Sequence, residues 1–506
     1  MDITKRQIGF LLVSLLVIAL CGIVYELIIG AISSYLLGDS VYQFSITIGL
    51  FMFAMGIGSM LTKYFSDRFI ENFIRVELAI AFFGGLSGIA MFVVFPYARV
   101  IYETTMYSFI LVIGALVGME IPILTGLLSE IKSAKQSIAE VLSFDYLGAL
   151  VGSVAFPLLL LPSLGLIQSS FVIGSLNAFV ALFTVITFKS YLKNYNRYMI
   201  AVFTVIGILL VCVIMGTRIT SFAEKHLYFD QVVFNKQTPY QHLVMTRSST
   251  TGDERLFIDG HIQFSSRDEH RYHEYLVHPI MSRPGERKKI LILGGGDGMA
   301  VREVLKYADV KQVTLVDIDP EMIRIGKQLY PLRKLNKNAL LDDRVITVTE
   351  DAFSFLNRAG DTFDRIIIDM PDPHNEALNK LYSREFYKMA NKRLSPQGFL
   401  VTQSSSPFFA NRAYWAVRET LKDVFEQGHS YKVSLPSFGI WGFHLVSHHE
   451  QDFSDWTFGV DTKAINSDAM KAAGFFESDL LPKSKVESNS IFAPTIYRYY
   501  TEDLKS

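Results

Sequence analysis

Cysteine is nearly absent from this chain of 506 residues, which contains only two. Both, Cys21 and Cys212, lie in apolar runs, so the residues after 216 contain none. The second half of the chain therefore has no disulfide framework, no cysteine-based metal site and no thiol nucleophile. A domain without cysteine tolerates either redox compartment, so this absence does not place it.

Charge is also scarce, but only in one part of the chain. Residues before about 216 are mostly Leu, Ile, Val, Phe, Ala and Gly, and the residues after it carry most of the Asp, Glu, Lys and Arg. The formal net charge is -1, and no Lys/Arg run indicates nucleic acid binding. The length and the shift in composition predict more than one domain.

Seven apolar segments of the first half come close to the roughly 20 residues that a membrane-spanning helix needs. They are Ile8–Gly30, Val41–Leu61, Leu78–Phe95, Met106–Leu128, Leu142–Leu161, Ser169–Phe188 and Tyr198–Met215. The first is too long for a cleavable signal peptide. Residues 1–216 are therefore predicted to form a multi-pass transmembrane domain of about seven helices.

Basic residues gather at the N-terminus and in alternate connections between these segments, which predicts a cytoplasmic N-terminus. They are Lys5, Arg6, Lys63, Arg68, Arg75, Lys132, Lys135, Lys189, Lys193 and Arg197, whereas the other connections hold only Arg99. Seven spans would put the second half of the chain outside the cytoplasm, and one miscounted span reverses that conclusion.

Three acidic residues lie within the predicted spans: Glu26, Glu120 and Asp145. A carboxylate at the centre of a bilayer costs about 2.5–3.5 kcal/mol, so such residues usually face a partner or a cavity. They are interpreted either as structural polar contacts or as a pocket for a cation.

Residues 217–284 are predicted to form a small β-rich domain. TPYQHLVMTRS and ERLFIDGHIQFS are short runs of strand type, and Asp259-Gly260 is a strong hairpin signal. A helical pattern follows from about Asp268. Its cluster of possible ligands lacks the order of a known zinc motif, so no metal site is predicted; the cluster is His270, His273, Glu274 and His278.

The stretch ILILGGGDGMAVREVL, Ile290–Leu305, joins a strand-type run to a helical pattern through a glycine-rich turn. Glycine permits positive φ angles and lets a ligand approach the backbone closely. A strand, a tight turn and a helix N-terminus form the geometry that nucleotide-like ligands use. The glycines are Gly294, Gly295, Gly296 and Gly298. Such a loop also occurs as a plain turn, so the residues that follow decide its role.

Acidic residues end or follow the next three predicted strands. Asp317 comes 23 residues after Gly294, close to the offset at which an acid binds ribose hydroxyls. Ligands of open parallel sheets bind outside the carboxyl ends of the strands, so the acids should converge on one crevice. No Ser-His-Asp order or P-loop lysine accompanies them, which favours a cationic ligand. The other acids are Asp297, Asp351, Asp369 and Asp372. Residues 285–506 therefore predict a Rossmann-like α/β domain.

Taken together, motifs from about Pro239 to Phe443 resemble the spermidine synthases, the polyamine aminopropyltransferases. They are YQ, LFIDGHIQ, RDEHRYHE, ILGGGDG, VDID, EDA, IDMPDP and LYSREFY. The stretch FDYLGALVGSVAFPLLLLP looks like the bacterial subgroup with an N-terminal multi-pass membrane domain. The resemblance implies a class I methyltransferase-like fold. It also implies transfer of the aminopropyl group of decarboxylated S-adenosylmethionine to an amine such as putrescine, giving spermidine and methylthioadenosine.

The resemblance also implies roles for individual residues. Gln241 and the loop Gly294–Gly298 would contact the nucleoside, Asp317 would bind the ribose hydroxyls, and Asp351 would lie on the adenine side. Decarboxylated S-adenosylmethionine is then a co-substrate, and neither a cofactor nor a metal is expected.

The remaining residues belong, by the same resemblance, to the reacting groups. Asp297 would face the aminopropyl ammonium, and Tyr272 and His273 would border the cleft. Asp369 would be the catalytic carboxylate, and Asp372 would anchor the distal ammonium of the acceptor.

This sequence departs from the family's pattern at three points. The family often has Gln at the position of His273. Asp-Met-Pro-Asp-Pro stands where soluble members often have Asp-Ser-Ser-Asp-Pro, although both acids keep their positions. Leu435 stands where soluble members usually have a tyrosine that helps to hold the amine. Putrescine, cadaverine, agmatine and spermidine therefore all stay open as acceptors.

Two other functions compete with this one: an S-adenosylmethionine-dependent methyltransferase, and a polyamine transporter or sensor whose second half binds without turnover. The predicted location is the bacterial inner membrane. Basic residues put the second half outside, whereas the expected cytosolic supply of decarboxylated S-adenosylmethionine puts it inside. The oligomeric state is open, with a homodimer among the options.

Overall fold

The computed structural model describes residues 4–37, 40–65, 68–96, 99–129, 133–216, 218–219, 227–358, 360–482 and 484–504. Lys132, and residues 217 and 220–226 at the start of the predicted β-rich domain, lie outside these ranges. The chain divides into two compact units, Met1–Pro239 and Tyr240–Ser506. The boundary between them falls inside the segment 217–284, and the division into three domains stays a prediction.

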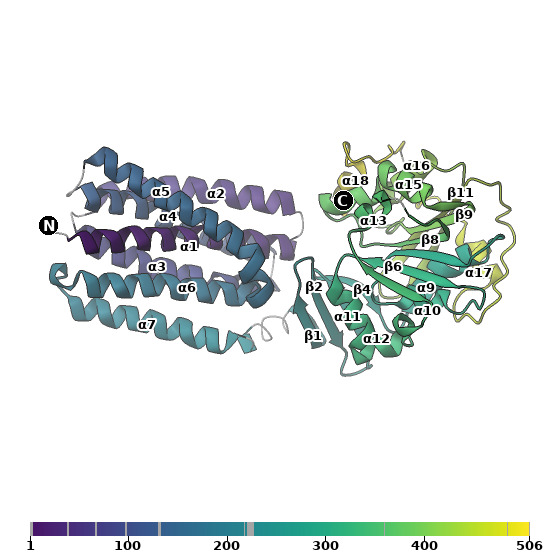
Figure 1. The fold of residues 1–506 in the computed structure, drawn as a ribbon, viewed down its shortest axis with the longest axis horizontal. Coiled ribbons are helices and arrows are strands. Elements are labelled where there is room, and N and C mark those ends of the chain that lie inside the picture. The colour runs from purple at the N-terminus through teal and green to yellow at the C-terminus, as the bar shows by residue number, and fades with distance from the viewer. Residues whose placement is uncertain are drawn as a thin grey trace. The chain divides into compact units, whose positions relative to one another are not determined.

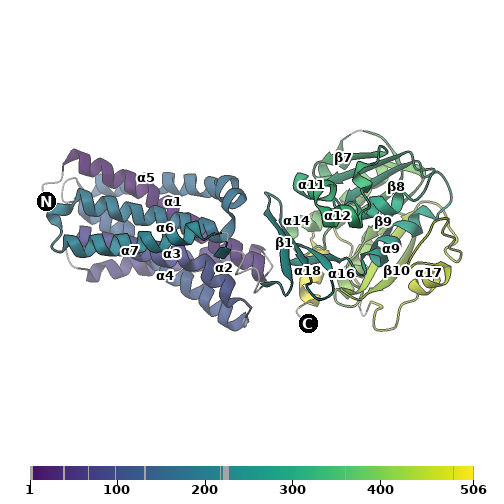
Figure 2. The same ribbon diagram turned by 90° about the horizontal axis from the view of Figure 1, so that it is seen from below.

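The first unit is built from long apolar helices that lie side by side (Figures 1 and 2). The described helices are α1 (Lys5–Leu37), α2 (Ser40–Leu61), α3 (Phe69–Val94), α4 (Arg99–Ser129), α5 (Ala134–Ala155), α6 (Leu161–Thr187) and α7 (Tyr195–Ile214). Short helical turns are η1 (Thr62–Tyr64), η2 (Phe156–Leu160) and η3 (Lys189–Tyr191), and strand β1 (Gln231–Gln237) follows. Each predicted apolar segment overlaps one of these long helices.

Six helical segments of the described chain are long and apolar enough to cross a membrane, and one of them, Ala134–Thr187, has 54 residues. A straight helix of that length would be about 81 Å long, far more than a bilayer core of about 30 Å. Gly165 interrupts it with φ 71° and ψ -175°. Both α5 and α6 pack against α1, so the chain reverses between them. The segment therefore corresponds to two of the predicted spans.

Glycines let helices of this unit approach each other closely. A Cβ atom at Gly58 of α2 would collide with the backbone of Ala115 in α4, and one at Gly118 of α4 would collide with the backbone of Met55. Small residues at such crossings are the usual means of packing helices whose surroundings are as apolar as their side chains. The α2–α4 contact is accordingly one of the most extensive in the unit.

The second unit begins with the antiparallel strands β2 (His242–Arg247), β3 (Glu254–Ile258) and β4 (His261–Ser265). Asp259 and Gly260 join β3 to β4 with φ angles of 50° and 80°, the turn that an Asp-Gly pair favours. Helix α9 (Glu269–Met281) follows and carries two of the expected site residues, Tyr272 and His273.

The main sheet has seven strands in the order β10-β11-β9-β8-β5-β6-β7. They are β5 (Lys289–Gly294), β6 (Gln312–Asp317), β7 (Val345–Thr349), β8 (Phe363–Asp369), β9 (Leu394–Gln403), β10 (Gln427–Leu435) and β11 (Gly439–Ser447). Strands β5 to β9 are parallel, as the sequence predicts, whereas β10 and β11 are antiparallel. The sheet is therefore mixed and wider than the five predicted strands. This arrangement is the class I methyltransferase-like fold.

Helices cover both faces of this sheet (Figures 1 and 2). Ile290 and Ile292 of β5 belong to one buried cluster, and Leu291 and Leu293 belong to another, because successive side chains of a strand point to opposite faces. The other helices are α10 (Met299–Val304), α11 (Pro320–Gln328), α12 (Tyr330–Leu335), η4 (Ala339–Leu341), α13 (Ala352–Asn357), α14 (Glu376–Asn379), η5 (Lys380–Tyr382), α15 (Arg384–Lys392), α16 (Asn411–Lys422), α17 (Ser467–Ala473) and α18 (Thr495–Asp503).

Strand order reverses between β5 and β8, which are neighbours although two strands separate them in sequence. Such a switch point leaves a crevice at the carboxyl ends of the strands, since the connections on its two sides lead in opposite directions. The glycine loop follows β5, and Asp369 ends β8. Both therefore lie at the position where ligands of this architecture bind.

Arg365 of β8 fixes the end of helix α9. Its guanidinium is buried and donates to the backbone oxygens of Ile280, Arg283 and Pro284 at 3.1, 2.9 and 2.9 Å. Carbonyl groups at a helix C-terminus lack partners within the helix, and a cation there also interacts favourably with the negative end of the helix dipole. Arg365 thereby helps to hold the helix that carries Tyr272 and His273.

Replacing Arg365 should destabilise the second unit. Arg365→Met removes a charged donor from three backbone carbonyl groups, of which that of Ile280 keeps the N–H of Arg283, and we expect a loss of about 3 kcal/mol in the free energy of unfolding. All three tryptophans lie in the second unit, so tryptophan fluorescence during chemical denaturation reports on it alone. Arg324→Met, which removes an exposed pair with Glu321, is the control and should change stability by less than about 1 kcal/mol. Equal losses in both variants would contradict this role of Arg365.

Candidate active site

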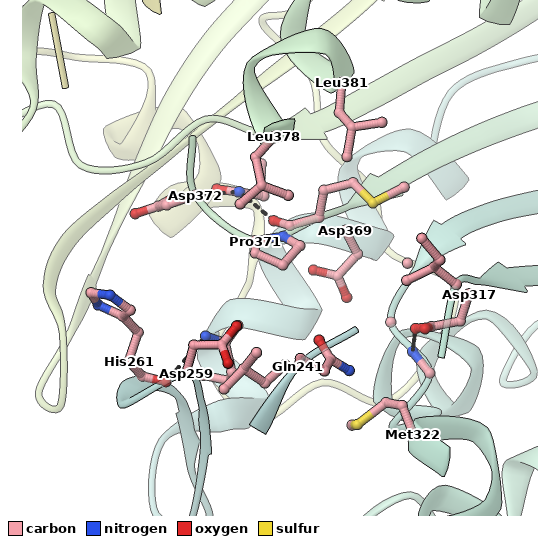
Figure 3. A pocket seen from close by; sticks show the side chains of 18 of the residues that line it. Gln241, Asp259, His261, Asp317, Met322, Asp369, Pro371, Asp372, Leu378 and Leu381 are labelled. Atoms are coloured by element: carbon pink, nitrogen blue, oxygen red, sulfur yellow. Dashed lines mark hydrogen bonds between the residues drawn. The ribbon is translucent and has the colours of Figure 1, made fainter. Parts of the chain in front are cut away.

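A cavity of about 510 Å³ lies within the second unit at the carboxyl ends of β5, β6 and β8. All the site residues expected from the sequence line it, except Gly298. In Figure 3, Gln241 and Asp259 lie on one side of the open space, with Asp369 and Asp372 opposite and Asp317 at one end. The structure thus brings together residues that are spread over more than 130 positions of the chain.

The glycine loop follows the edge of this cavity. Gly294, Gly295 and Gly298 have φ angles of 84°, 65° and 83°, a region that other residues rarely adopt. Gly294 pairs with Asp369 across the two strands, and a Cβ atom on Gly294 would collide with the backbone oxygen of Asp369. Gly298 precedes helix α10 and shapes the turn without lining the cavity. Glycine is therefore required here both by the turn and by the approach of β8.

Asp317 faces the loop from the end of β6. It accepts hydrogen bonds from the backbone N–H groups of Gly296 and Asp319, at 3.0 and 2.9 Å. Burial nevertheless raises the pKa of its carboxyl group to about 6. Gln241 reaches the same region, where its amide donates to Asp319 at 3.0 Å. Asp317 keeps free acceptor positions that a ligand's hydroxyl groups could use.

Asp297 is buried at the N-terminus of α10. Its carboxylate accepts the backbone N–H of Met299 at 2.8 Å. Asn336 donates to the backbone oxygens of Asp297 and Gly326 at 2.7 and 2.9 Å, and so ties the loop to helix α11. No motif in the sequence pointed to Asn336, which lies 39 residues after the loop.

Asp351 caps helix α13 and also carries an ion pair. Its carboxylate accepts the backbone N–H of Ser354 at 3.2 Å, and Nζ of Lys380 lies 3.2 Å from its other oxygen. Lys380 also lines the cavity, so this pair forms part of its wall. The sequence placed Asp351 at the crevice but gave no sign of Lys380 as its partner.

Asp369 is partly buried next to the hydroxyl of Tyr272, which donates to its carboxylate at 2.7 Å. Burial raises the pKa of Asp369 to about 6. The positive charge of His273 and the bond from Tyr272 oppose that shift, whereas the negative charge of Asp297 adds to it. A carboxyl group with a pKa in this range can take up and release a proton near neutral pH.

Asp372 lies in the loop after β8 and is also partly buried. Its carboxylate accepts hydrogen bonds from the hydroxyls of Tyr500 and Ser405 at 3.1 and 3.2 Å, and the amide of Gln403 lies 3.5 Å away. Burial raises its pKa to about 6 in spite of these donors. Tyr500 comes from the C-terminal helix α18, 128 residues along the chain, so sequence spacing could not reveal this contact.

His273 belongs to a buried chain of charges beneath the cavity. Its Nδ1 lies 2.9 Å from the carboxylate of Glu269, which Arg302 binds with two N–H groups at 2.8 and 2.9 Å. Burial disfavours a charged imidazole, but the bond to Glu269 and the charges of Glu269, Asp297 and Asp369 raise the pKa of His273 to about 9. His273 is therefore cationic at neutral pH, a property the sequence did not indicate.

Two other residues considered for a metal site, Glu274 and His278, have structural partners. Glu274 accepts three backbone N–H groups, from Lys463, Ala464 and Ile465, at 2.7, 2.7 and 3.1 Å. His278 contacts Glu303 at 2.9 Å and Tyr307 at 3.0 Å. The contacts of Glu274 hold helix α9 against the segment after the sheet, and those of His278 hold it against α10 and the turn that follows α10.

Further residues of the cavity wall were not among the sequence candidates. Asp259 accepts the backbone N–H of His242 at 2.8 Å, and burial raises its pKa to about 6. The imidazole rings of His261 and His374 lie 4.8 Å apart, and burial lowers the pKa of both. Trp441 donates to Gln403 at 3.2 Å. The Asp-Gly-His segment was seen in the sequence as a hairpin signal and as part of the motif LFIDGHIQ, but no site role was given to its residues.

Comparisons with known proteins match a family domain in the second unit and relatives along almost the whole chain. Residues 269–455 match the spermine/spermidine synthase domain. Polyamine aminopropyltransferase 2 of Ralstonia nicotianae is 41% identical, over 99% of this chain and 99% of its own length. The polyamine aminopropyltransferase of Oceanobacillus iheyensis is 39% identical, over 96% of this chain and 95% of its own length. A crystal structure of a spermidine synthase with the transition-state analogue AdoDATO is 25% identical, covers 49% of this chain and 85% of its own, and has a TM-score of 0.45.

Replacing Glu269 should change how the stability of the second unit depends on pH. The pKa of His273 is about 9 in the folded chain and 6.5 for a free imidazole. Its bond to Glu269 therefore stabilises the fold fully below pH 6.5 and progressively less as pH rises through 9. Glu269→Gln should lose about 3 kcal/mol at pH 6.5 and less at pH 9, as measured by tryptophan fluorescence during chemical denaturation. An exposed-residue control, Glu286→Gln, should lose little at either pH. A loss that is independent of pH would contradict the charged state of His273.

Proposed function

Since this chain belongs to the polyamine aminopropyltransferases, of the spermine/spermidine synthase family, we propose that its second unit binds decarboxylated S-adenosylmethionine and transfers the aminopropyl group to an amine. Putrescine is the simplest such amine, and the products are then spermidine and methylthioadenosine. The observation that carries this proposal is the pair of partly buried carboxyl groups, Asp369 and Asp372, beside a glycine loop at the switch point of the sheet.

The nucleoside would occupy the glycine-loop side of the cavity. The backbone of Gly294–Gly296 offers close approach, and Asp317 has acceptor positions for the ribose hydroxyls. Asp351 would bind on the adenine side, where its carboxylate now pairs with Lys380. Gln241 borders this side of the cavity from the small sheet. The ligand is cationic, so buried carboxyl groups around it gain an opposite charge.

The reaction is a single displacement at the carbon next to the sulfonium. The lone pair of the neutral amine forms the new N–C bond, the C–S bond breaks, and its electron pair stays on sulfur as a neutral thioether. The amine nitrogen loses one proton, which Asp369 accepts. An alkylammonium has a pKa of about 10, so a nearby carboxylate is needed to hold the amine as a nucleophile. The leaving group is neutral, and its departure needs no further charge stabilisation.

Asp297 and His273 supply charge on either side of the reacting group. Asp297 would face the ammonium end of the aminopropyl group. The carboxylate of ordinary S-adenosylmethionine would meet a negative charge there, and such repulsion gives specificity. Cationic His273 lowers the pKa of Asp369 and so keeps more of it in the form that accepts a proton.

The acceptor would lie between Asp369 and Asp372. A diamine with one nitrogen at Asp369 would place its other ammonium at Asp372, whose carboxylate is oriented by Tyr500 and Ser405. Leu435 lines the cavity at the position where the resemblance leads one to expect a tyrosine. The choice among putrescine, cadaverine, agmatine and spermidine stays open. The relatives named above are polyamine aminopropyltransferases, and they match this chain over nearly their whole length. The methyltransferase and the binding-only alternatives therefore have no support.

The helical unit would anchor this enzyme in the bacterial inner membrane. Its support is the length and apolar character of the helices, with six candidate spans in the described chain, one of them folded back on itself. We place the active site on the cytoplasmic side, because the nucleoside substrate is expected there.

Asp369→Asn should remove the reaction while leaving the nucleoside site intact. An amide cannot accept the amine's proton, so we expect kcat/KM to fall about 10²- to 10⁴-fold, followed as methylthioadenosine released from decarboxylated S-adenosylmethionine and putrescine. Calorimetric binding of methylthioadenosine should stay unchanged. Asp361→Asn, an exposed aspartate before β8, should retain full activity. Undiminished transfer by Asp369→Asn would refute the role of this carboxylate.

Tyr272→Phe should shift the acid side of the pH profile. The tyrosine hydroxyl bonds to the ionised form of Asp369 and lowers its pKa, so without it the pKa rises above 6. Activity then begins to fall at a higher pH as the medium is acidified, by about one pH unit if the bond contributes about 1.4 kcal/mol. The measurement is kcat/KM against pH, and exposed Tyr330→Phe should leave the profile unchanged. An unshifted profile in Tyr272→Phe would show that Asp369 does not set the acid side.

A reporter at the C-terminus tests the side of the membrane. A protein that fluoresces only in the cytosol, fused after Ser506, should be fluorescent in growing cells. The same position fused to alkaline phosphatase, which is active only outside the cytoplasm, should be inactive. The opposite pattern would put the active site outside, as the distribution of Lys and Arg predicts for seven spans.

A further inference from the structure

Two glutamates meet in the interior of the helical unit. Glu77 lies on α3 and is 0% exposed, and Glu120 lies on α4 and is 2% exposed. Their carboxyl groups are within hydrogen-bonding distance of each other. Two ionised carboxylates at that distance repel strongly where water is absent, so the pair has to hold a proton between them.

The surroundings of this pair do not neutralise it. Asn177 of α6 donates to Glu77 at 3.0 Å. One oxygen of each glutamate, the amide oxygen of Asn177 and the hydroxyl of Tyr25 have no hydrogen-bond partner among the described residues. Within that part of the chain, neither carboxyl group forms an ion pair with Lys or Arg. Unpartnered buried oxygens of this kind point to a bound cation, and a proton is the cation that needs no additional space.

Glu71, on the same helix as Glu77, is a structural acid with ion-pair partners. It lies near the start of α3, about two turns before Glu77, and its carboxylate is 3.5 Å from both Arg68 and Arg75. The backbone N–H of Lys193 also donates to it, at 3.4 Å. A single helix thus carries one acid with cationic partners at its end and another without them in the interior. The contrast argues against a plain packing role for Glu77.

We propose that Glu77 and Glu120 form a proton-binding site that exchanges its proton with the medium, and that the helical unit is therefore a proton-handling device as well as an anchor. Ionisable groups inside apolar helical bundles are costly and serve mainly as proton or ion relays. The helices that supply the pair, α3 and α4, pack against each other and against α1 or α6. A change in protonation would alter the contact between them. This proposal does not depend on the aminopropyl transfer of the second unit.

Infrared spectroscopy of the full-length protein in membranes tests the proposal. Wild type should show the C=O stretch of a protonated carboxyl group at neutral pH. The band should shift in D₂O and lose intensity as pH is raised. The wild-type spectrum minus that of the double variant Glu77→Gln/Glu120→Gln should contain this band, and the wild-type spectrum minus that of Glu71→Gln, whose parent carboxylate is ion-paired, should not. A difference band that does not respond to D₂O would overturn the proposal. So would identical bands in wild type and the double variant.

A second variant tests the proposal if the double variant does not fold. Asn177→Leu removes the amide donor to Glu77 and leaves both carboxyl groups in place. Loss of that donor favours the protonated form, so the band should persist to higher pH than in wild type. An unchanged titration would overturn the proposal. Retained elution volume and a retained helical signal in circular dichroism identify the preparations whose helical unit is folded.

Discussion

Burial of several carboxyl groups at one edge of a sheet is the constraint on which the rest of the second unit depends. Asp317, Asp369 and Asp372 each have a pKa raised to about 6 by burial, so each is costly to keep ionised without a counterion. The cationic substrate proposed above would supply that counterion. The protein supplies hydrogen-bond donors in the meantime, chiefly from Tyr272, Tyr500 and the backbone of the glycine loop.

The scaffold beneath these acids is correspondingly rigid. Helix α9 is fixed at its end by Arg365 and in its first turn by the Glu269–Arg302 pair, so the side chains of Tyr272 and His273 are held against Asp369. The close pairing of Gly294 with Asp369 fixes the distance between the glycine loop and the end of β8. The positively charged imidazole of His273 lies next to these carboxylates. Its charge reduces the repulsion between Asp297 and Asp369 before a substrate binds.

The helical unit also buries carboxyl groups, and it provides fewer hydrogen-bond and ion-pair partners for them. Near the helix ends, Glu71 finds arginines, whereas Glu77 and Glu120 in the interior find mainly each other. The expectation of a cation pocket built from Glu26, Glu120 and Asp145 named only one member of this pair. Glu77 was missed because it lies one residue before the predicted span that begins at Leu78. Glu26 of α1 is buried and Asp145 of α5 is partly exposed.

The sequence by itself determined the features that local order along the chain encodes. Apolar length predicted the helices of the first unit, the Asp-Gly pair predicted the hairpin, and acids placed after consecutive strands predicted the crevice, because parallel strands end at the same edge. The sequence did not predict the antiparallel strands β10 and β11, because no local pattern in the chain sets their position in the sheet. Tertiary structure alone decided which distant groups set the chemistry: Tyr500 at Asp372, Lys380 at Asp351, Arg302 behind His273, and Glu77 beside Glu120. Each of these contacts depends on burial and on the geometry between elements, which residue spacing along the chain does not contain.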